Sequence, residues 1–266
     1  MRKMLNIAFL FILSAAASTA YAQERITAKW NDPSRPGLLK VDWHNGSIII
    51  KTHSTNDVTI DTKGGSTTRP VPAEAGGLRR IDGGGRGLVV DSEPNNVMTI
   101  SGPSSSGEVE IEVPVKTNLN LISHNGRTIS VDSVEGDIEV TNHNGSVQLT
   151  NVGGSVVAHS MNGKVTVSFR DIAAGKPMSF SSMNGSVDVT LPGTAKADLK
   201  MRTDNGAVYT DFDVQMKTGA AITNQDQGGG RYRIEIDKTI SGSINGGGTE
   251  IELRTRNGNI YLRKGK

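Results

Sequence analysis

Residues 129–167 read ISVDSVEGD IEVTNHNGS VQLTNVGGS VVAHSMNGK VTV, in which a nine-residue unit repeats without a slip. Apolar residues occupy the first and third positions of each unit, a larger side chain the sixth, and glycine the eighth. Alternation with a period of two is typical of a strand with one buried face. Asn-Gly pairs are typical of tight turns. The repeat therefore predicts an all-β protein of short strands separated by corners.

The same unit recurs on both sides of this stretch, out to Leu39 on one side and Leu262 on the other. Its corner is usually Asn-Gly, and we expect glycine there because it tolerates positive φ. The predicted structural turns are Asn45, Gly46, Asn125, Gly126, Asn144, Gly145, Asn162, Gly163, Asn184, Gly185, Asn205, Gly206, Asn257 and Gly258.

Corner spacing separates two architectures. From Asn125 to Asn205 the Asn-Gly corners recur at intervals of about 20 residues, with weaker corners such as Glu135-Gly136 between the first of them. Two units per turn of a coil explain this alternation, so we predict a single-domain β-solenoid, similar to a parallel β-helix, built of nine-residue half-rungs. Asn-Gly is also the strongest hairpin signal. The alternative is therefore an antiparallel β meander.

The repeat domain is expected to span residues 23–266, with loop insertions near 64–87 and 217–231 where the pattern weakens. A stack of strands exposes an edge at each end, and each edge needs a cap. We expect residues 23–36 to fold over the first rung through Trp30. The expected cover of the other end is a group of C-terminal cations, namely Arg254, Arg256, Arg263, Lys264 and Lys266.

Residues 1–22 have the pattern of a secretory signal peptide: Arg2 and Lys3, then an apolar run, then Ala20-Tyr21-Ala22. The predicted protein is exported and periplasmic, cell-surface or extracellular. Removing this segment takes away two cations and no anion, so the formal net charge falls from +2 to zero. This balance argues against nucleic acid as a partner. No apolar run is long enough to predict a transmembrane segment.

The strand EVEIEVP at 108–114, followed by Asn118-Leu119-Asn120-Leu121 and serial Asn-Gly units, resembles the bacterial "putative adhesin" β-strand-repeat family. The resemblance covers about residues 39–262. It implies an exported, non-enzymatic surface or envelope protein with a β-solenoid fold. It supplies no catalytic residues.

The chain contains no cysteine and none of the standard hydrolase, zinc-protease or phosphate-loop motifs. The acids Asp132, Asp137, Glu139 and Asp188 are expected on different faces or distant rungs, so no acid–base pair is predicted. We therefore predict no catalytic residues, no cofactor and no enzymatic activity. A polysaccharide-acting β-helix enzyme is an alternative, and an envelope sensor or scaffold protein is another.

The sixth position of successive units should form a column that contains His124, His143 and Met161. Imidazole and thioether groups are copper ligands. We predict that these side chains only fill the corner and that no metal binds, with the column kept as the alternative metal site. His44, Met183 and Asp204 occupy the same position in other units.

The outward positions of the predicted strands are mostly polar and of mixed charge, which suits a flat binding surface. These positions are Ser130, Gln148, Thr166, Asp188 and Tyr209, and on the other sheet Asn120, Glu139, Val157, Ser179 and Lys200. The predicted function is a non-catalytic cell-envelope or secreted adhesin or binding scaffold. Its partner is an unknown surface ligand, either protein or glycan.

Overall fold

The computed structural model describes residues 25–63, 87–102, 107–217, 222–226, 232–236 and 239–265. The predicted signal peptide lies outside these residues, as does the 64–87 insertion apart from Gly87. Of the 217–231 insertion, Lys217 and residues 222–226 are described. All regular structure in the described residues is β-strand.

The strands of the first half are β1 (Arg25–Lys29), β2 (Gly37–His53), β3 (Asp57–Lys63), β4 (Val89–Glu93), β5 (Val97–Ser101), β6 (Glu108–Pro114), β7 (Thr117–Asp132), β8 (Ile138–Asn142), β9 (Ser146–Val152), β10 (Val156–Ser160) and β11 (Val165–Phe169). Those of the second half are β12 (Met178–Asn184), β13 (Val187–Leu191), β14 (Ala197–Asn205), β15 (Val208–Thr210), β16 (Gln215–Met216), β17 (Ile222–Asp226), β18 (Tyr232–Ile236), β19 (Ile240–Ile244), β20 (Thr249–Asn257) and β21 (Ile260–Lys264).

Strands of the central repeat pair in parallel with the strand two units further along the chain. Ile138 of β8 lies opposite Val156 of β10, and Val147 of β9 lies opposite Val165 of β11. β12 and β13 continue the two series. The parallel pairing expected between units two apart is thus observed in these strands.

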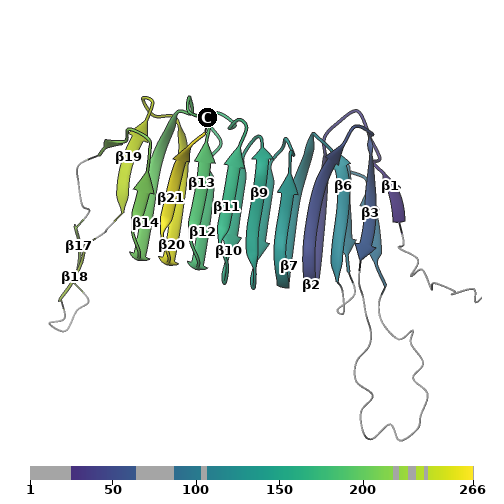
Figure 1. The fold of residues 1–266 in the computed structure, drawn as a ribbon, viewed down its shortest axis with the longest axis horizontal. Coiled ribbons are helices and arrows are strands. Elements are labelled where there is room, and N and C mark those ends of the chain that lie inside the picture. Colours follow the sequence, from purple (N-terminus) through teal and green to yellow (C-terminus); the bar gives the residue numbers. More distant parts are fainter. Residues whose placement is uncertain are drawn as a thin grey trace, which may run out of the picture.

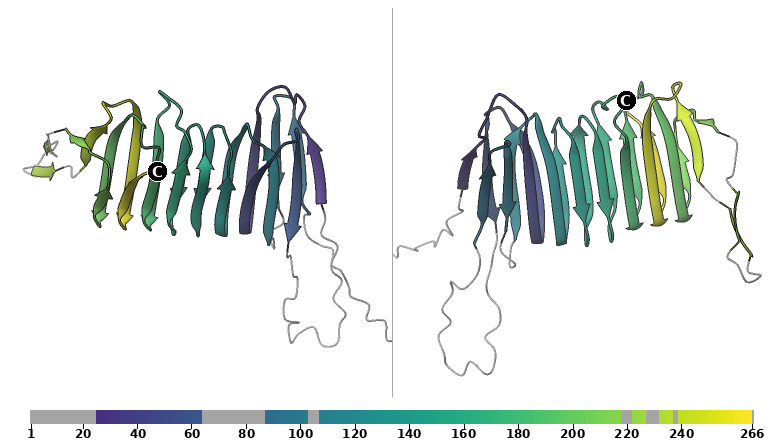
Figure 2. Two further views of the ribbon diagram at one scale, coloured as in Figure 1. Left: turned by 45° about the horizontal axis from the view of Figure 1, so that its top comes forward. Right: turned by 180° about the vertical axis from the view of Figure 1, so that it is seen from behind.

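Two ladders result, and the long strands β2 and β7 take part in both. One ladder runs β5–β2–β7–β8–β10–β12–β20–β14, and the other runs β6–β2–β7–β9–β11–β13–β21–β15. Because β2 and β7 join them, the ladders belong to one mixed, 19-stranded sheet. Figure 1 shows the strands standing side by side in a row, and Figure 2 shows the same row after rotation.

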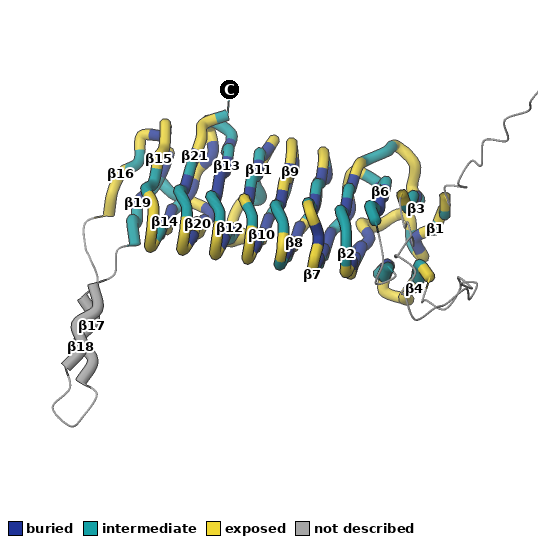
Figure 3. Tube along the Cα trace, turned by 60° about the horizontal axis from the view of Figure 1, so that its bottom comes forward, coloured by how far each residue is buried: buried dark blue, intermediate teal, exposed yellow. Residues whose placement is uncertain are grey.

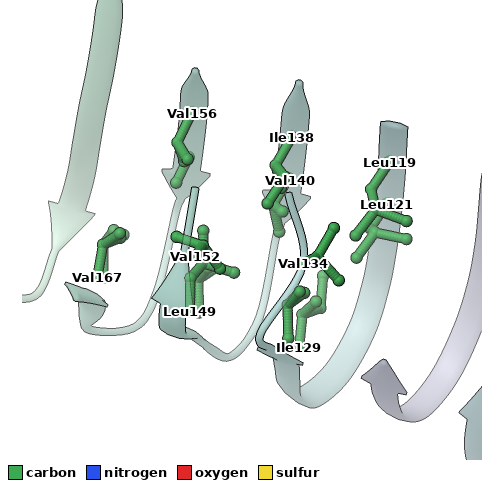
Figure 4. Close-up of a cluster of buried hydrophobic side chains, with 14 of the residues drawn as sticks. Leu119, Leu121, Ile129, Val134, Ile138, Val140, Leu149, Val152, Val156 and Val167 are labelled. Carbon is green, nitrogen blue, oxygen red and sulfur yellow. The ribbon is translucent and has the colours of Figure 1, made fainter. Parts of the chain in front are cut away.

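The apolar first and third positions of the units point between the two ladders and form one core. Figure 3 shows the buried residues along the row. Figure 4 shows part of this core, where Leu119 and Leu121 of β7 lie near Ile138 and Val140 of β8. Each of these four side chains is at most 2% exposed. The period-two pattern therefore identified the core face correctly.

Spatial order departs from chain order at the C-terminal end. β20 lies between β12 and β14, where Ile251 is paired with both Met178 and Leu199. β21 lies between β13 and β15 in the same way, and Figure 1 shows both yellow strands inside the green part of the row. The expectation that C-terminal cations cover an end of the stack is therefore wrong for β20 and β21, because these strands have parallel neighbours on both sides.

The antiparallel pairs of the sheet lie at its two ends. At the N-terminal end β1 pairs with β3, β3 with β6, and β4 with β5. At the other end β19 pairs with β14 and β16, and β17 and β18 form a separate two-stranded sheet. Trp30, which follows β1, is 7% exposed and packs its ring against Gly37 at the start of β2.

The corner glycines serve a different purpose from the expected one at most positions. Among the predicted turn glycines, only Gly46 (φ 114°) and Gly258 (φ 159°) have positive φ. At Gly163 an added Cβ would lie 2.3 Å from the carbonyl oxygen of Gly145, and at Gly185 it would lie 2.2 Å from that of Gly163. Glycine is needed there because neighbouring corners stack too closely for a side chain.

Candidate functional site

The asparagines of the Asn-Gly corners form a continuous hydrogen-bonded ladder along one edge of the molecule. Each Nδ2 donates to the Oδ1 of its neighbour: Asn144 to Asn125 (3.0 Å), Asn162 to Asn144 (2.9 Å), Asn184 to Asn162 (2.9 Å), Asn257 to Asn184 (2.7 Å) and Asn205 to Asn257 (2.8 Å). Asn45 lies opposite Asn125 in the β2–β7 pair. These amides bond mainly to one another, as in stacked β-structures, which is a structural role.

A second, inner row of hydroxyl groups supports the corners. Ser160 donates to the carbonyl oxygen of Gly145 (2.8 Å), and Ser182 donates to that of Gly163 (2.9 Å). Thr255 and Thr203 do the same for Gly185 and Gly258 (2.7 and 2.8 Å). Sequence reasoning missed this row, although these four corners each show a Ser or Thr two residues before the Asn. The bonds satisfy buried carbonyls that would otherwise cost stability.

The residue just before each ladder asparagine projects from the same edge. We name these residues the edge strip; in spatial order they are His44, His124, His143, Met161, Met183, Arg256 and Asp204. His124 and His143 are partly buried and the other five are exposed. The edge strip therefore presents imidazole, thioether and charged groups at the regular spacing of the strands.

The three histidines of the edge strip form a stack. The ring centroids of His44 and His124 are 4.7 Å apart, and those of His124 and His143 are 5.1 Å apart with an interplanar angle of 13°. Met161 follows at the next corner of the ladder, where the N–H of Asn162 donates to the carbonyl oxygen of His143. The structure thus brings together His124 and His143, which the sequence placed in one column.

Asp42 joins this histidine stack, which the sequence analysis did not foresee. It precedes His44 by two residues on β2, so both side chains point to the same side of the sheet. Its Oδ1 lies 3.4 Å from Nε2 of His124. One ligand atom from each of Asp42, His44 and His124 can be chosen so that all lie within 4.8 Å of one another. Counting back two residues from His44 could have found it.

Asp188, expected on an exposed polar surface, is only 8% exposed. Nζ of Lys164 donates to its Oδ2 (3.0 Å) and Nε of Arg263 donates to its Oδ1 (2.8 Å). The expectation was wrong because these two long side chains cover the carboxylate. Burial raises the pKa of Asp188, but hydrogen bonds from Arg263 and Lys164 outweigh it and hold this pKa below its ordinary value.

A stacked pair of tyrosines lies beside this carboxylate. Tyr209, expected to be exposed, is 52% exposed, and its ring stacks on Tyr261 with centroids 5.3 Å apart. The guanidinium of Arg263 lies 5.2 Å from the centre of the Tyr261 ring. This cluster joins β13, β21 and β15, so it fastens the inserted C-terminal strand to its neighbours.

The other three acids considered for acid–base work have separate partners. Asp137 bonds to Lys176 (2.9 Å), Glu139 accepts a bond from Asn120 (3.0 Å), and Asp132 accepts one from Ser133 (3.0 Å). Each partner differs, so these contacts do not bring the acids together as a pair.

No helix in the described ranges has the length and apolar character needed to cross a membrane. No family model matches the chain, and no curated protein matches its sequence. The chain has a distant structural similarity to a "putative cell adhesion protein" from Clostridium sporogenes ATCC 15579, known from a crystal structure. That similarity has a TM-score of 0.43 and 11% identity, and covers 91% of this chain and 100% of the other.

Proposed function

We propose that this chain is an exported, non-catalytic binding protein, and that the edge strip is the surface that contacts a protein or glycan on its target. The observation that carries the proposal is the edge strip itself, a row of seven side chains in register that project away from the core. The Asn ladder and the inner hydroxyl row already hold the corners, which leaves the exposed members of the edge strip available to a partner.

The composition of the edge strip supports a binding role. Met161 and Met183 are 37% and 41% exposed, on neighbouring units of the ladder. Thioether side chains adapt their shape to a partner and are common on binding surfaces. Arg256 and Asp204 supply charges at one end of the edge strip and the histidines supply polar groups at the other. A partner would thus bury apolar area at the centre and make polar contacts at both ends.

The regular spacing of the edge strip follows from a proposed β-solenoid winding. Each winding places two units in the two ladders, and the parallel pairs β8–β10 and β9–β11 support this arrangement. Neighbouring side chains on such a ladder repeat about every 4.8 Å. A partner surface would therefore meet a rigid, evenly spaced row, which lowers the entropic cost of binding.

Two features of the sequence support export and the absence of catalysis. The first 22 residues have the pattern of a signal peptide, and the chain has no cysteine and no standard catalytic motif. Export is tested by fractionation of intact cells and by N-terminal sequencing, which should find Gln23 as the first residue. Recovery of the uncleaved chain in the cytoplasm would contradict it.

Binding is tested with beads coated with the purified protein, applied to an array of surface glycans and to immobilised envelope proteins. The double variant Met161→Ser/Met183→Ser should weaken retention about tenfold or more, because burial of each Met side chain is worth about 1.5–3 kcal/mol. Val157→Ser is the matched control, since Val157 is 43% exposed on β10 away from the edge strip. Equal loss in both variants would contradict the proposal.

A further inference from the structure

We propose that Asp42, His44 and His124 bind one divalent transition-metal ion, either Cu²⁺ or Zn²⁺. The proposal does not depend on the binding function of the edge strip, although the two share His44 and His124. It replaces the donor set considered from the sequence, because Asp42 and His44 take the places of His143 and Met161.

The strand register creates the site. In the parallel β2–β7 pair, Trp43 lies opposite Ser123 and Asn45 opposite Asn125, so His44 and His124 face each other across neighbouring strands. Asp42 lies on the same side of β2 as His44. The three residues each offer one donor atom, and these atoms lie within 4.8 Å of one another. Two nitrogen donors and one oxygen donor therefore lie close enough for small side-chain rotations to bring them onto one ion.

The chemistry of the donors selects the class of ion. Imidazole nitrogen suits copper and zinc, and three protein ligands with an open position for water form a common zinc arrangement. Asp42 and His44 are exposed, so an ion can reach the donors from solvent. For one set of nitrogen and oxygen ligands, Cu²⁺ binds more tightly than Zn²⁺. We therefore expect affinity for both ions in that order.

The neighbouring ring of His143 favours a fixed orientation of His124. His143 stacks on His124 nearly parallel, and its Nδ1 lies 3.2 Å from the carbonyl oxygen of Ser123. His124 is thus held between His44 on one side and His143 on the other. Because the ring is already ordered, less side-chain entropy is lost when an ion binds.

The test is calorimetric titration of the untagged protein with CuCl₂ and with ZnCl₂. We expect one ion per chain, with Cu²⁺ bound more tightly. His44→Ala and His124→Ala should each weaken binding by more than about 10–100-fold, the loss that removal of an outer-shell partner alone causes. Asp42→Asn should also weaken it. His53→Ala is the control, because His53 lies beside Asp57 and Thr55 and is not one of the three proposed ligands, and this variant should bind as wild type does.

Electron paramagnetic resonance of the one-to-one Cu²⁺ complex gives a second readout. Wild type should show coupling to two imidazole nitrogens, and His44→Ala to one. Asp42→Asn changes an exposed side chain and keeps the fold, so it decides the question if a histidine variant unfolds. The proposal is overturned if wild type binds neither ion, or if either Asp42→Asn or a folded histidine variant binds Cu²⁺ with unchanged affinity and spectrum.

Discussion

The central strands β8–β13 and the C-terminal strands β14, β15, β20 and β21 are built from the same kind of unit but are assembled differently. In the centre, each unit pairs with the unit two positions along, and chain order equals spatial order. At the C-terminal end β14 and β15 do not pair with β12 and β13. The later strands β20 and β21 lie between them, β20 between β12 and β14 and β21 between β13 and β15. A repeat therefore specifies how a unit packs without specifying which units become neighbours.

The fit of β20 and β21 between their neighbours shows that a unit distant in the chain can replace a sequential one. Asn257 fits between Asn184 and Asn205 with hydrogen bonds of 2.7 and 2.8 Å, as short as those of the central ladder. The carbonyl oxygen of Gly258 accepts a hydrogen bond from the hydroxyl of Thr203, as the carbonyl oxygen of Gly145 does from the hydroxyl of Ser160. The inserted unit thus makes the same contacts as a sequential one, and the two regions should have similar local stability.

Deletion of residues 249–264 gives the largest expected effect. It removes four fully buried side chains, namely Ile251, Leu253, Ile260 and Leu262. Each is worth about 1.5–3 kcal/mol, so the loss is comparable to the whole stability of a domain, about 5–15 kcal/mol. We expect an unfolded or aggregated chain by circular dichroism, and partial recovery when a peptide of residues 249–264 is added. An unchanged urea midpoint would show that the inserted unit is dispensable.

Two matched leucine substitutions compare the regions directly. Leu149 in β9 and Leu253 in β20 are at most 1% exposed, so replacement of either by alanine should cost about 2–5 kcal/mol. Urea unfolding of the two variants should show one cooperative transition each, with similar midpoints. A separate early transition in Leu253→Ala alone would mean that the inserted unit unfolds independently of the centre.

Glycine substitutions test why the corners need glycine. Gly163→Ala should cost about 1–3 kcal/mol because its Cβ would collide with the carbonyl of Gly145 in the stacked corner. Gly175→Ala is the control for conformation alone, since Gly175 has φ 76° and open space around it. It should cost about 1 kcal/mol in thermal unfolding. If the two costs were reversed, close stacking would not be the reason for glycine in the ladder.

Substitution of Asp188 should have the smallest effect on the free energy of unfolding. This effect should depend on pH, because Arg263 of the inserted strand β21 bonds to the Asp188 carboxylate. Its pKa is lower in the folded protein, so its stabilisation is present above the unfolded value of about 3.8 and is lost as pH falls through the folded value. Asp188→Asn should cost about 1–2 kcal/mol at pH 7. The difference between the variant and wild type should disappear in acid below that range. A constant difference in unfolding midpoint from pH 7 to pH 2 would contradict this.

The sequence predicted the strand units, their buried face and the Asn-Gly corners, because all three follow from a local period. It did not predict the place of β20 and β21, since every unit carries the same pattern and chain order was the only guide to neighbours. Asp42 was missed for a related reason: the period of nine directed attention to position six, and a partner two residues earlier on the strand lies outside that column. The cover over Asp188 depended on Arg263, which the expected chain order placed at an end.

The position of β20 and β21 also constrains how the molecule is made. Residues 249–264 are synthesised after β14 and β15, yet they occupy the interior of the row, paired in parallel on both sides. The nascent polypeptide can build its ladders up to β13 as it emerges, but β14 and β15 lack their parallel neighbours until residues 249–264 have been made. The ladders are therefore completed by closure of an internal gap rather than by growth at a tip.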